Sequence, residues 1–282
     1  MVVFRVFDII LRFEKTRFVS LNNCILNSQI PKHQNDNMSA NIRWNAPSMP
    51  PVTKHLIIIN AILWIATMLL KSRGINLVEY LGLHFWKASD FHIYQFLTYM
   101  FMHDDSNFSN GFMHIFFNMF ALFMFGTLLE KVMGMKRYIM FYVVCGLGAG
   151  LAQEVVWQFT DGSITEDFVR FVDEQGTVVD TVTRKEFFNM LITVGASGAV
   201  FGILLGFAML FPNIPLYIMF IPVPVKAKWA VLGYALLELF FGVSGVMGSV
   251  AHFAHLGGML FGFILLYYWK KKGLFNNYYV NG

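Results

Sequence analysis

From Pro50 onward the chain contains one apolar stretch after another, each close to the length that crosses a bilayer. About 20 consecutive apolar residues, coiled as a helix, span the hydrocarbon core of a membrane. Such stretches lie near residues 55–71, 112–131, 136–157, 190–211, 227–246 and 250–269. In lipid each backbone polar group must be satisfied within its own segment, which favours helices. The sequence therefore predicts an all-α fold, a polytopic membrane bundle of six transmembrane helices.

Composition supports a membrane protein over a soluble one. Of the 282 residues, 56% are hydrophobic and 13% are charged, whereas a soluble domain carries about 25% charged residues. The formal net charge of +4 is unevenly spread, because segment 158–190 holds seven acids and three bases. In a membrane protein this asymmetry indicates which side a loop occupies. We therefore expect a lipid bilayer as partner and no nucleic acid.

Basic residues near the ends of the predicted helices set their orientation, because Lys and Arg collect on the cytoplasmic side. They lie in the connections after helices two and four and in the tail, at Lys131, Lys136, Arg137, Lys226, Lys228 and residues 270–272. We expect these places, and both termini, to be cytoplasmic. The outer face then carries loop 72–111, in which the run 91–102 is interfacial or re-entrant. It also carries the polar insertion 158–190, with a small hairpin near Gly176.

Residues 1–50 differ from the rest of the chain. They mix charges with short apolar runs and end in a polar stretch. Charges within the opening apolar run make it a poor signal peptide. We expect an N-terminal cytoplasmic extension, a membrane domain over 51–272 and a tail over 273–282. Our hypothesis is that translation begins at Met38 or Met49.

Four polar side chains interrupt the apolar stretches, and such residues are costly in a membrane. His114 and Asn118 share one face of the second stretch, Ser197 lies in the fourth and His255 in the sixth. These three stretches run inward from the outer face. At about 1.5 Å per residue, all four side chains lie within roughly 10 Å of the outer boundary. Three separate helices thus deliver polar groups to a similar depth.

Small residues predict close contact between the fourth and sixth helices. Gly198, Gly202 and Gly206 repeat every four residues on one, and Gly258 and Gly262 on the other. This spacing lets helices approach closely. Ser197 and His255 would then reach hydrogen-bonding distance, and a neutral imidazole can remove the proton of a serine. His114 and Asn118 would donate hydrogen bonds to a developing oxyanion, beside the backbone N–H of Ser197.

Each of these residues also has a structural explanation. A serine in a membrane helix commonly bonds its own backbone, and Asn118 can join two helices. His252 ranks below His255 as a candidate, because it lies about 60° short of a full helical turn from that residue. A small transporter or channel is an alternative, with His114 and His255 as a proton relay and Glu238 as a charge in the fifth helix.

No His-Glu-x-x-His motif or cysteine pair occurs, so we expect neither a metal nor a cofactor.

Three motifs together resemble the signatures of the rhomboid family of intramembrane serine proteases. They are His114-x-x-x-Asn118, then Gly195-Ala-Ser197-Gly198, then Ala254-His255-x-x-Gly258-x-x-x-Gly262. The run Gly126…Glu130…Gly134 is also similar, and the resemblance covers about residues 51–269. Six helices agree with the basic bacterial form of the family.

The resemblance implies a rhomboid-like fold and a role for each motif residue. Ser197 is the nucleophile and His255 the general base of a dyad without a catalytic Asp. His114, Asn118 and the Ser197 N–H form the oxyanion hole, and Gly195, Gly198 and Gly258 support the site. Phe201 occupies the place where members often stack a Tyr on the histidine. Tyr94-Gln95 replaces a Trp-Arg pair of the first loop, so the hydrogen-bond fork of arginine is lost.

The implied activity is that of a serine endopeptidase. It would cleave transmembrane segments of single-span membrane proteins near the outer face, through an acyl-enzyme, in a bacterial plasma membrane. The fifth helix and the turn 245–249 would form the gate for substrate. A rhomboid-like pseudoprotease that binds membrane helices without cutting them is the other alternative, although such relatives usually lack the serine or the histidine.

Overall fold

The computed structural model describes residues 49–103, 108–173, 176–217, 223–244 and 251–275. Nearly the whole N-terminal extension, including the proposed start at Met38, lies outside the described residues. So do the turn 245–249 of the predicted gate and most of the tail. The described part is mostly helical, as expected for this composition.

Within the described residues, seven α-helices and one π-helical turn build the bundle. They are α2 (Pro51–Lys71), α5 (Phe108–Ala121), the π-helical η2 (Leu122–Gly126), α6 (Thr127–Met133), α7 (Met135–Thr160), α9 (Ser197–Leu210), α10 (Ala227–Ser244) and α11 (His252–Lys271). The elements α5, η2 and α6 form one continuous helix. Gly134, at a φ of 73°, makes the sharp turn from α6 into α7.

Four of the helices among the described residues are long and apolar enough to cross a membrane. They are Pro51–Lys71, Phe108–Met133, Met135–Thr160 and Ala227–Ser244. Helix α9 is apolar but has 14 residues. Helix α11 has 20 residues, and histidines near one end and lysines at the other make it more polar. The protein is thus a mostly helical membrane protein.

The predicted start of the fourth stretch was wrong. The sequence predicted a helix over 190–211, but α9 begins at Ser197. The preceding residues leave α8 (Arg184–Met190), pass through the short strand β4 (Ile192–Thr193) and reach Gly195, whose φ is 135°. A φ of this sign cannot continue a right-handed helix. Hydropathy alone does not distinguish such a buried extended segment from a helix.

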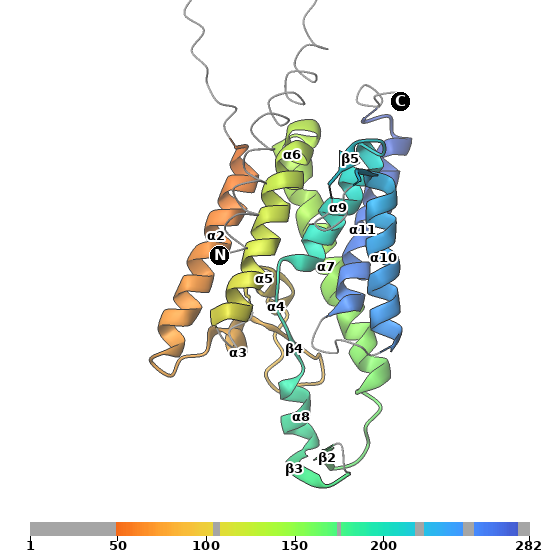
Figure 1. Ribbon diagram of the computed structural model, residues 1–282. Coiled ribbons are helices and arrows are strands. Elements are labelled where there is room, and N and C mark those ends of the chain that lie inside the picture. The colour runs from red at the N-terminus through yellow and green to blue at the C-terminus, as the bar shows by residue number, and fades with distance from the viewer. Residues whose placement is uncertain (1–48, 104–107, 174–175, 218–222, 245–250, 276–282) are drawn as a thin grey trace, which may run out of the picture. The chain divides into compact units, whose positions relative to one another are not determined.

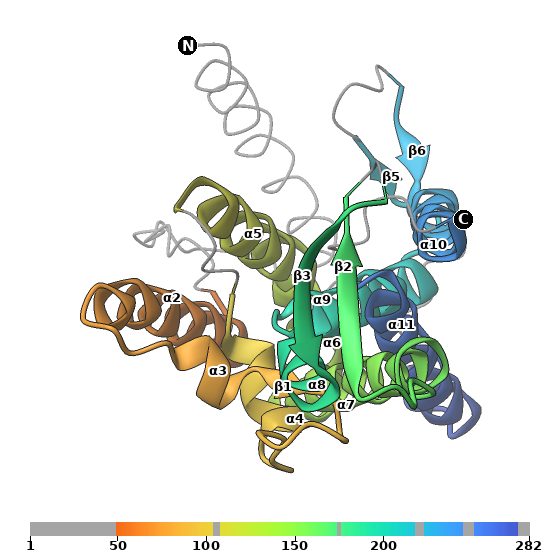
Figure 2. The same cartoon turned by 90° about the horizontal axis from the view of Figure 1, so that it is seen from below.

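The core lies where α7, α9 and α11 meet. Helix α7 contributes the fully buried side chains of Tyr138, Phe141, Tyr142 and Cys145. Helix α11 packs along both α7 and α9. In Figures 1 and 2, α2 and α10 lie on opposite sides of this central group. The fold therefore surrounds α9, which carries the candidate serine, with other helices.

The first loop and the insertion lie at one end of the bundle (Figure 1). The loop forms α3 (Leu77–Leu81), β1 (Leu83–His84), α4 (Gln95–Thr98) and a 3-10 turn, η1 (Tyr99–Phe101). The insertion contains the predicted hairpin, because β2 (Phe168–Val172) pairs antiparallel with β3 (Val178–Thr183). Strand β1 pairs with β4 and so ties the loop to the segment that leads into α9.

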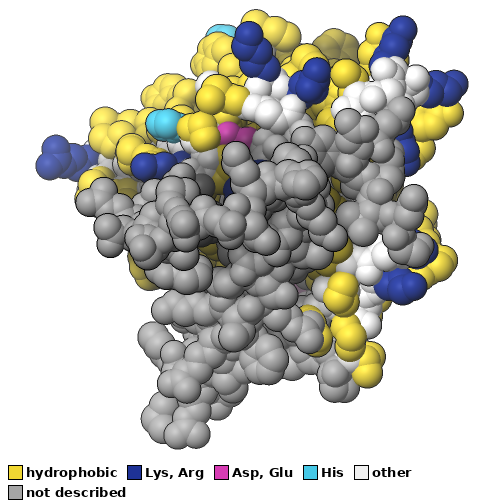
Figure 3. Space-filling model, turned by 90° about the horizontal axis from the view of Figure 1, so that it is seen from above, with side chains coloured by type: hydrophobic (Ala, Val, Ile, Leu, Met, Phe, Trp, Pro, Cys, Tyr) yellow, Lys and Arg dark blue, Asp and Glu magenta, His cyan; other side chains and the backbone are white. Residues whose placement is uncertain are grey.

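The opposite end carries the turn between α6 and α7. It also carries the short pair of β5 (Pro215–Leu216) and β6 (Val225–Lys226). Figure 3 looks onto this end and shows Lys and Arg side chains around its rim. The basic connections that the sequence grouped together therefore share one end of the bundle.

Candidate active site

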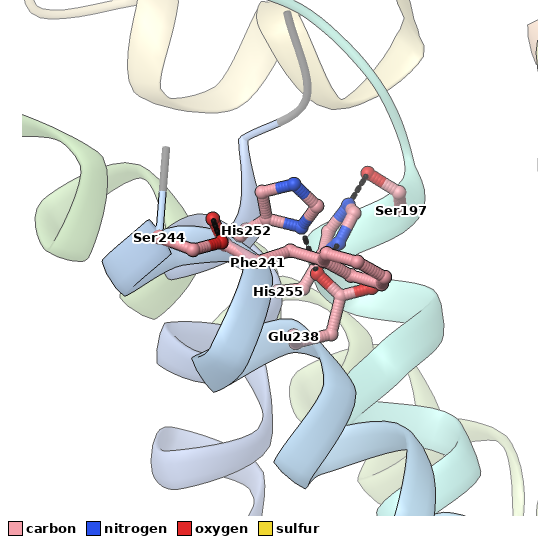
Figure 4. Close-up of polar contacts among 6 residues, drawn as sticks. All are labelled: Ser197, Glu238, Phe241, Ser244, His252 and His255. Carbon is pink, nitrogen blue, oxygen red and sulfur yellow. Dashed lines mark hydrogen bonds and ion pairs between the residues drawn. The ribbon is translucent and has the colours of Figure 1, made fainter. Parts of the chain in front are cut away.

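Ser197 and His255 meet between two helices (Figure 4). Ser197 is the first residue of α9, and His255 lies in the first turn of α11. The distance from Oγ of Ser197 to Nε2 of His255 is 2.8 Å. This is a hydrogen-bonding distance between a hydroxyl and an imidazole nitrogen. The structure thus brings together the two residues that the motifs single out for nucleophile and base.

Glycines make this meeting possible, as their spacing predicted. A Cβ atom on Gly258 would overlap the carbonyl oxygen of Gly198, and one on Gly202 would lie 3.0 Å from the carbonyl oxygen of Gly258. Helices α9 and α11 therefore touch backbone to backbone. Gly206 differs from the prediction, because it faces the ring of Phe141 on α7, with 3.0 Å between that ring and an added Cβ.

Gly195 lies between Ser197 and the side chain of His114, which belongs to α5. Its φ of 135° lies in a region that residues with a Cβ rarely adopt. Its N–H donates to the carbonyl oxygen of Tyr99 at 3.0 Å. An added Cβ would lie 3.1 Å from Nε2 of His114 and 3.4 Å from Oγ of Ser197. Both side chains therefore border the same small space, which glycine leaves open.

Asn118 has a contact within its own helix. Its side-chain amide donates to the carbonyl oxygen of His114 at 2.8 Å, and the side chain is buried. An amide nitrogen carries two hydrogens, and this bond uses one. The ring of His114 also contacts His103, with ring centroids 5.1 Å apart. Burial, and then the nearby His114, lowers the pKa of His103 to about 3, so His103 stays neutral at physiological pH.

Phe201 lies one turn after the serine and stacks on the imidazole of His255. The ring centroids are 4.2 Å apart and the planes are inclined by 4°. The position that the resemblance assigns to a stacked aromatic ring is thus filled by one. The stack fixes the plane of the imidazole on one side, while the serine contacts its edge.

A carboxylate that sequence reasoning did not place in the site contacts the same imidazole. Oε2 of Glu238, from α10, lies 2.9 Å from Nδ1 of His255 and 2.7 Å from Nδ1 of His252. The sequence had ranked His252 low because of its angular offset, but the imidazole reaches the shared carboxylate. Two features of the sequence could have indicated this contact: His252 and His255 are three residues apart, and Glu238 is a lone acid in the neighbouring helix.

These three side chains also have the composition of a metal-ligand set. Candidate ligand atoms of Glu238, His252 and His255 lie within 4.8 Å of one another. The lack of a sequence motif had predicted no metal. The chain nevertheless gathers ligand-type groups here, and their mutual hydrogen bonds already satisfy both Nδ1 atoms.

Gln95 anchors the first loop in place of the arginine of the family pattern. It is fully buried, and its Oε1 accepts the N–H of His84 at 3.3 Å and of His92 at 3.0 Å. Its Nε2 donates to the carbonyl oxygens of Asp90 at 2.9 Å and Tyr80 at 3.5 Å. The fork of arginine is absent here, but the Gln95 amide bonds four backbone groups of the loop.

The family model of the Rhomboid domain matches residues 90–272, a region that includes His114, Ser197 and His255 and the helices that carry them. A search of curated proteins finds no match. Because the matched region covers more than half of the chain, this protein belongs to the rhomboid family, whose members are intramembrane serine proteases.

Proposed function

We propose that this protein is an active intramembrane serine endopeptidase that cleaves transmembrane segments of single-span membrane proteins. The observation that carries the proposal is the 2.8 Å contact between Oγ of Ser197 and Nε2 of His255. A serine hydroxyl is a weak nucleophile until a base removes its proton. The two residues come from different helices, so the contact reflects the packing of α9 against α11.

The reaction would follow from this pair. Oγ of Ser197 attacks the scissile carbonyl carbon while its proton moves to Nε2 of His255. The resulting imidazolium gives that proton to the leaving amine, and an acyl-enzyme remains on Oγ. Water then attacks the ester, with His255 again taking a proton and returning it to Oγ. A serine and a base account for all proton transfers.

An oxyanion would form beside the start of α9. The first N–H groups of a helix have no acceptor within it and point toward negative charge. The N–H of Ser197 is one of these, and His114 lies on the other side of Gly195. We assign His114, Asn118 and the Ser197 N–H to the oxyanion hole. Asn118 would use the second hydrogen of its amide, because the first bonds the carbonyl oxygen of His114.

We also propose that α9 and α11 cross the membrane together with the four longer helices, which gives six spans. At about 1.5 Å per residue, the 14 residues of α9 cover roughly 21 Å. A hydrocarbon core is about 30 Å thick, so Ser197 would lie near 10 Å below the outer boundary. We further propose that both termini lie in the cytoplasm, which the basic end of the bundle supports, and that the membrane is a bacterial plasma membrane.

The substrate must lose its helical structure locally. A helical peptide hides each carbonyl within a hydrogen-bonded turn. The resemblance to the family implies small residues before the cut and helix-breaking residues after it, and the latter would ease this loss of helix.

Cleavage of a model single-span substrate in liposomes tests the proposal. We expect wild-type protein to cleave it and to react with a serine-directed fluorophosphonate, and Ser197→Ala to do neither. Ser72→Ala is the matched control, because Ser72 is exposed at the end of α2 and bonds the carbonyl oxygen of Leu69. Absence of cleavage and labelling in the folded wild type would instead support a pseudoprotease that binds helices. Equal cleavage by wild type and Ser197→Ala would also contradict the proposal.

A further inference from the structure

The carboxylate of Glu238 stands at the centre of a polar cluster within the bundle. It projects from α10 toward the two imidazoles of α11, and Ser197 contacts the other edge of His255 (Figure 4). Its side chain is 14% exposed, and those of His252 and His255 are 6% and 10% exposed. Carboxylates within apolar helices are costly unless they are paired. The two imidazoles supply that pairing.

The hydrogen bonds determine which nitrogen of His255 carries a proton. An ionised carboxylate can only accept, so both Nδ1 atoms that face Oε2 of Glu238 donate to it. A neutral imidazole has one N–H. Nε2 of His255 is therefore an unprotonated acceptor, and the hydroxyl of Ser197 donates to it at 2.8 Å. This tautomer is the one that a general base needs.

We propose that Glu238 is a positioning residue of this protease, held by His252, which fixes the Nδ1–H tautomer and orientation of His255. The inference rests on the proposed function and extends it from a Ser–His pair to a Ser–His–Glu arrangement. When Nε2 takes the serine proton, His255 becomes an imidazolium. The negative charge 2.9 Å from Nδ1 then stabilises that cation. Phe201 covers one face of the ring but offers no charge.

His252 acts on Glu238 and not on the serine. Its Nδ1 donates to the same oxygen at 2.7 Å. Because a neutral imidazole has one N–H and Nδ1 carries it, Nε2 bears no proton; this atom is buried and has no hydrogen-bond partner among the described residues. The ring of Phe241 packs against it, with centroids 5.7 Å apart. His252 thus holds the carboxylate from the side away from Ser197.

Kinetics on the full-length protein in liposomes test the proposal. We expect Glu238→Gln, which keeps the shape but loses the charge, to lower kcat by at least about tenfold, which is part of the roughly 10²–10⁴-fold that general acid–base catalysis contributes. KM and thermal stability should stay near wild type. Glu154→Gln is the matched control, because Glu154 is also a buried acid in a long apolar helix. Its carboxylate accepts the N–H of Trp86 in the first loop and belongs to none of the three motifs. We expect that variant to keep wild-type kcat.

Nitrogen-15 NMR of labelled histidines gives a readout independent of cleavage. We expect His255 to carry its proton on Nδ1 in wild type and in Ser197→Ala, and to acquire an Nε2–H population in Glu238→Gln. A wild-type His255 protonated on Nε2 overturns the proposal whether or not the protein cleaves substrate. Wild-type kcat in Glu238→Gln, with Ser197→Ala inactive, overturns it while the protease assignment stands. Loss of wild-type cleavage on chelation would show that the cluster holds a metal, and would also overturn it.

Discussion

The ring of Phe201 lies parallel to the imidazole of His255, with centroids 4.2 Å apart. Phe201 lies one turn into α9 and His255 in the first turn of α11. These helices touch backbone to backbone, so small shifts of either helix would separate the rings. Aromatic pairs of this kind contribute about 1 kcal/mol beyond simple burial. The stack therefore restricts the imidazole to the plane in which it meets Ser197.

Replacing Phe201 should reduce catalysis more than stability. We expect Phe201→Ala to lower kcat about five- to tenfold, which corresponds to the roughly 1 kcal/mol of a lost aromatic pair. Phe201→Tyr retains the ring and should stay within about twofold of wild type. Cleavage of a single-span substrate and thermal melting of each variant provide the measurement. Unchanged kcat in Phe201→Ala would show that Glu238 and Ser197 orient the imidazole without the stack.

The glycine contact between α9 and α11 predicts a larger effect. A Cβ on Gly258 would overlap the backbone of Gly198, so Gly258→Ala should force the helices apart. Overpacking of this kind costs about 1–3 kcal/mol, and it should also lengthen the contact between Ser197 and His255. We expect a lower melting temperature together with loss of fluorophosphonate labelling.

Gly233→Ala is the control for that variant. Gly233 lies within α10 and has no atom within 4 Å of an added Cβ. Alanine is favoured over glycine in helices by up to about 1 kcal/mol, so this change should leave stability equal or slightly higher. Equal melting temperatures for the two variants would contradict the proposed backbone contact.

Hydropathy predicted most of the helical framework because long apolar stretches leave few alternatives. The stretches predicted at 112–131, 136–157 and 227–246 correspond to helices in the structure, and the predicted ends lie within a few residues of the observed ones. The prediction for the fourth stretch was wrong at its N-terminal end, where β4 and Gly195 precede the helix. Pairing of β4 with β1, some hundred residues earlier, determines that segment. Such a long-range pairing leaves no periodic pattern in the local sequence.

The sequence predicted the contacts that depend on small residues and on the positions of helix ends. It did not predict the contacts that depend on how far and in which direction a side chain extends from its helix. The spacing of the motifs was enough to predict the contact between Ser197 and His255. The contribution of Glu238 was missed because it requires the rotation of α10 about its own axis, and an almost uniformly apolar helix has no polar face to reveal that rotation. Gln95 was underestimated for a similar reason, since its four backbone partners come from a folded loop.

The anchoring of the first loop by Gln95 should be measurable as stability. Gln95→Leu keeps the side chain buried but leaves four backbone groups without this partner. Each unsatisfied buried group costs about 1–3 kcal/mol, so we expect a clearly lower melting temperature. The neighbouring variant Tyr94→Phe removes one exposed bond to Tyr80 and should change stability by less than about 0.5 kcal/mol. Similar losses in both would contradict a special role for Gln95.

Glu130, from the run Gly126…Glu130…Gly134 at the end of the second predicted helix, caps a different helix. Its carboxylate accepts the N–H of Val52 at 2.9 Å, and the N–H and hydroxyl of Thr53 at 2.7 and 2.8 Å. These residues form the first turn of α2, and the N-cap of that helix, Pro50, provides no side-chain bond. A carboxylate at this end is favoured by the helix dipole. Glu130 thus fastens α2 to the end of α6.

Removing this carboxylate should detach the first turn of α2. We expect Glu130→Ala to lower the free energy of unfolding by about 2–4 kcal/mol, because bonds to a buried charged group are worth about 1.5–3 kcal/mol. Amide hydrogen exchange at Val52 and Thr53 should accelerate, while exchange in α9 should stay near wild type. Glu79→Ala is the control, since Glu79 is an exposed acid bonded to Asn76. Unchanged exchange at Val52 and Thr53 in Glu130→Ala would show that the backbone of α2 is held by other contacts.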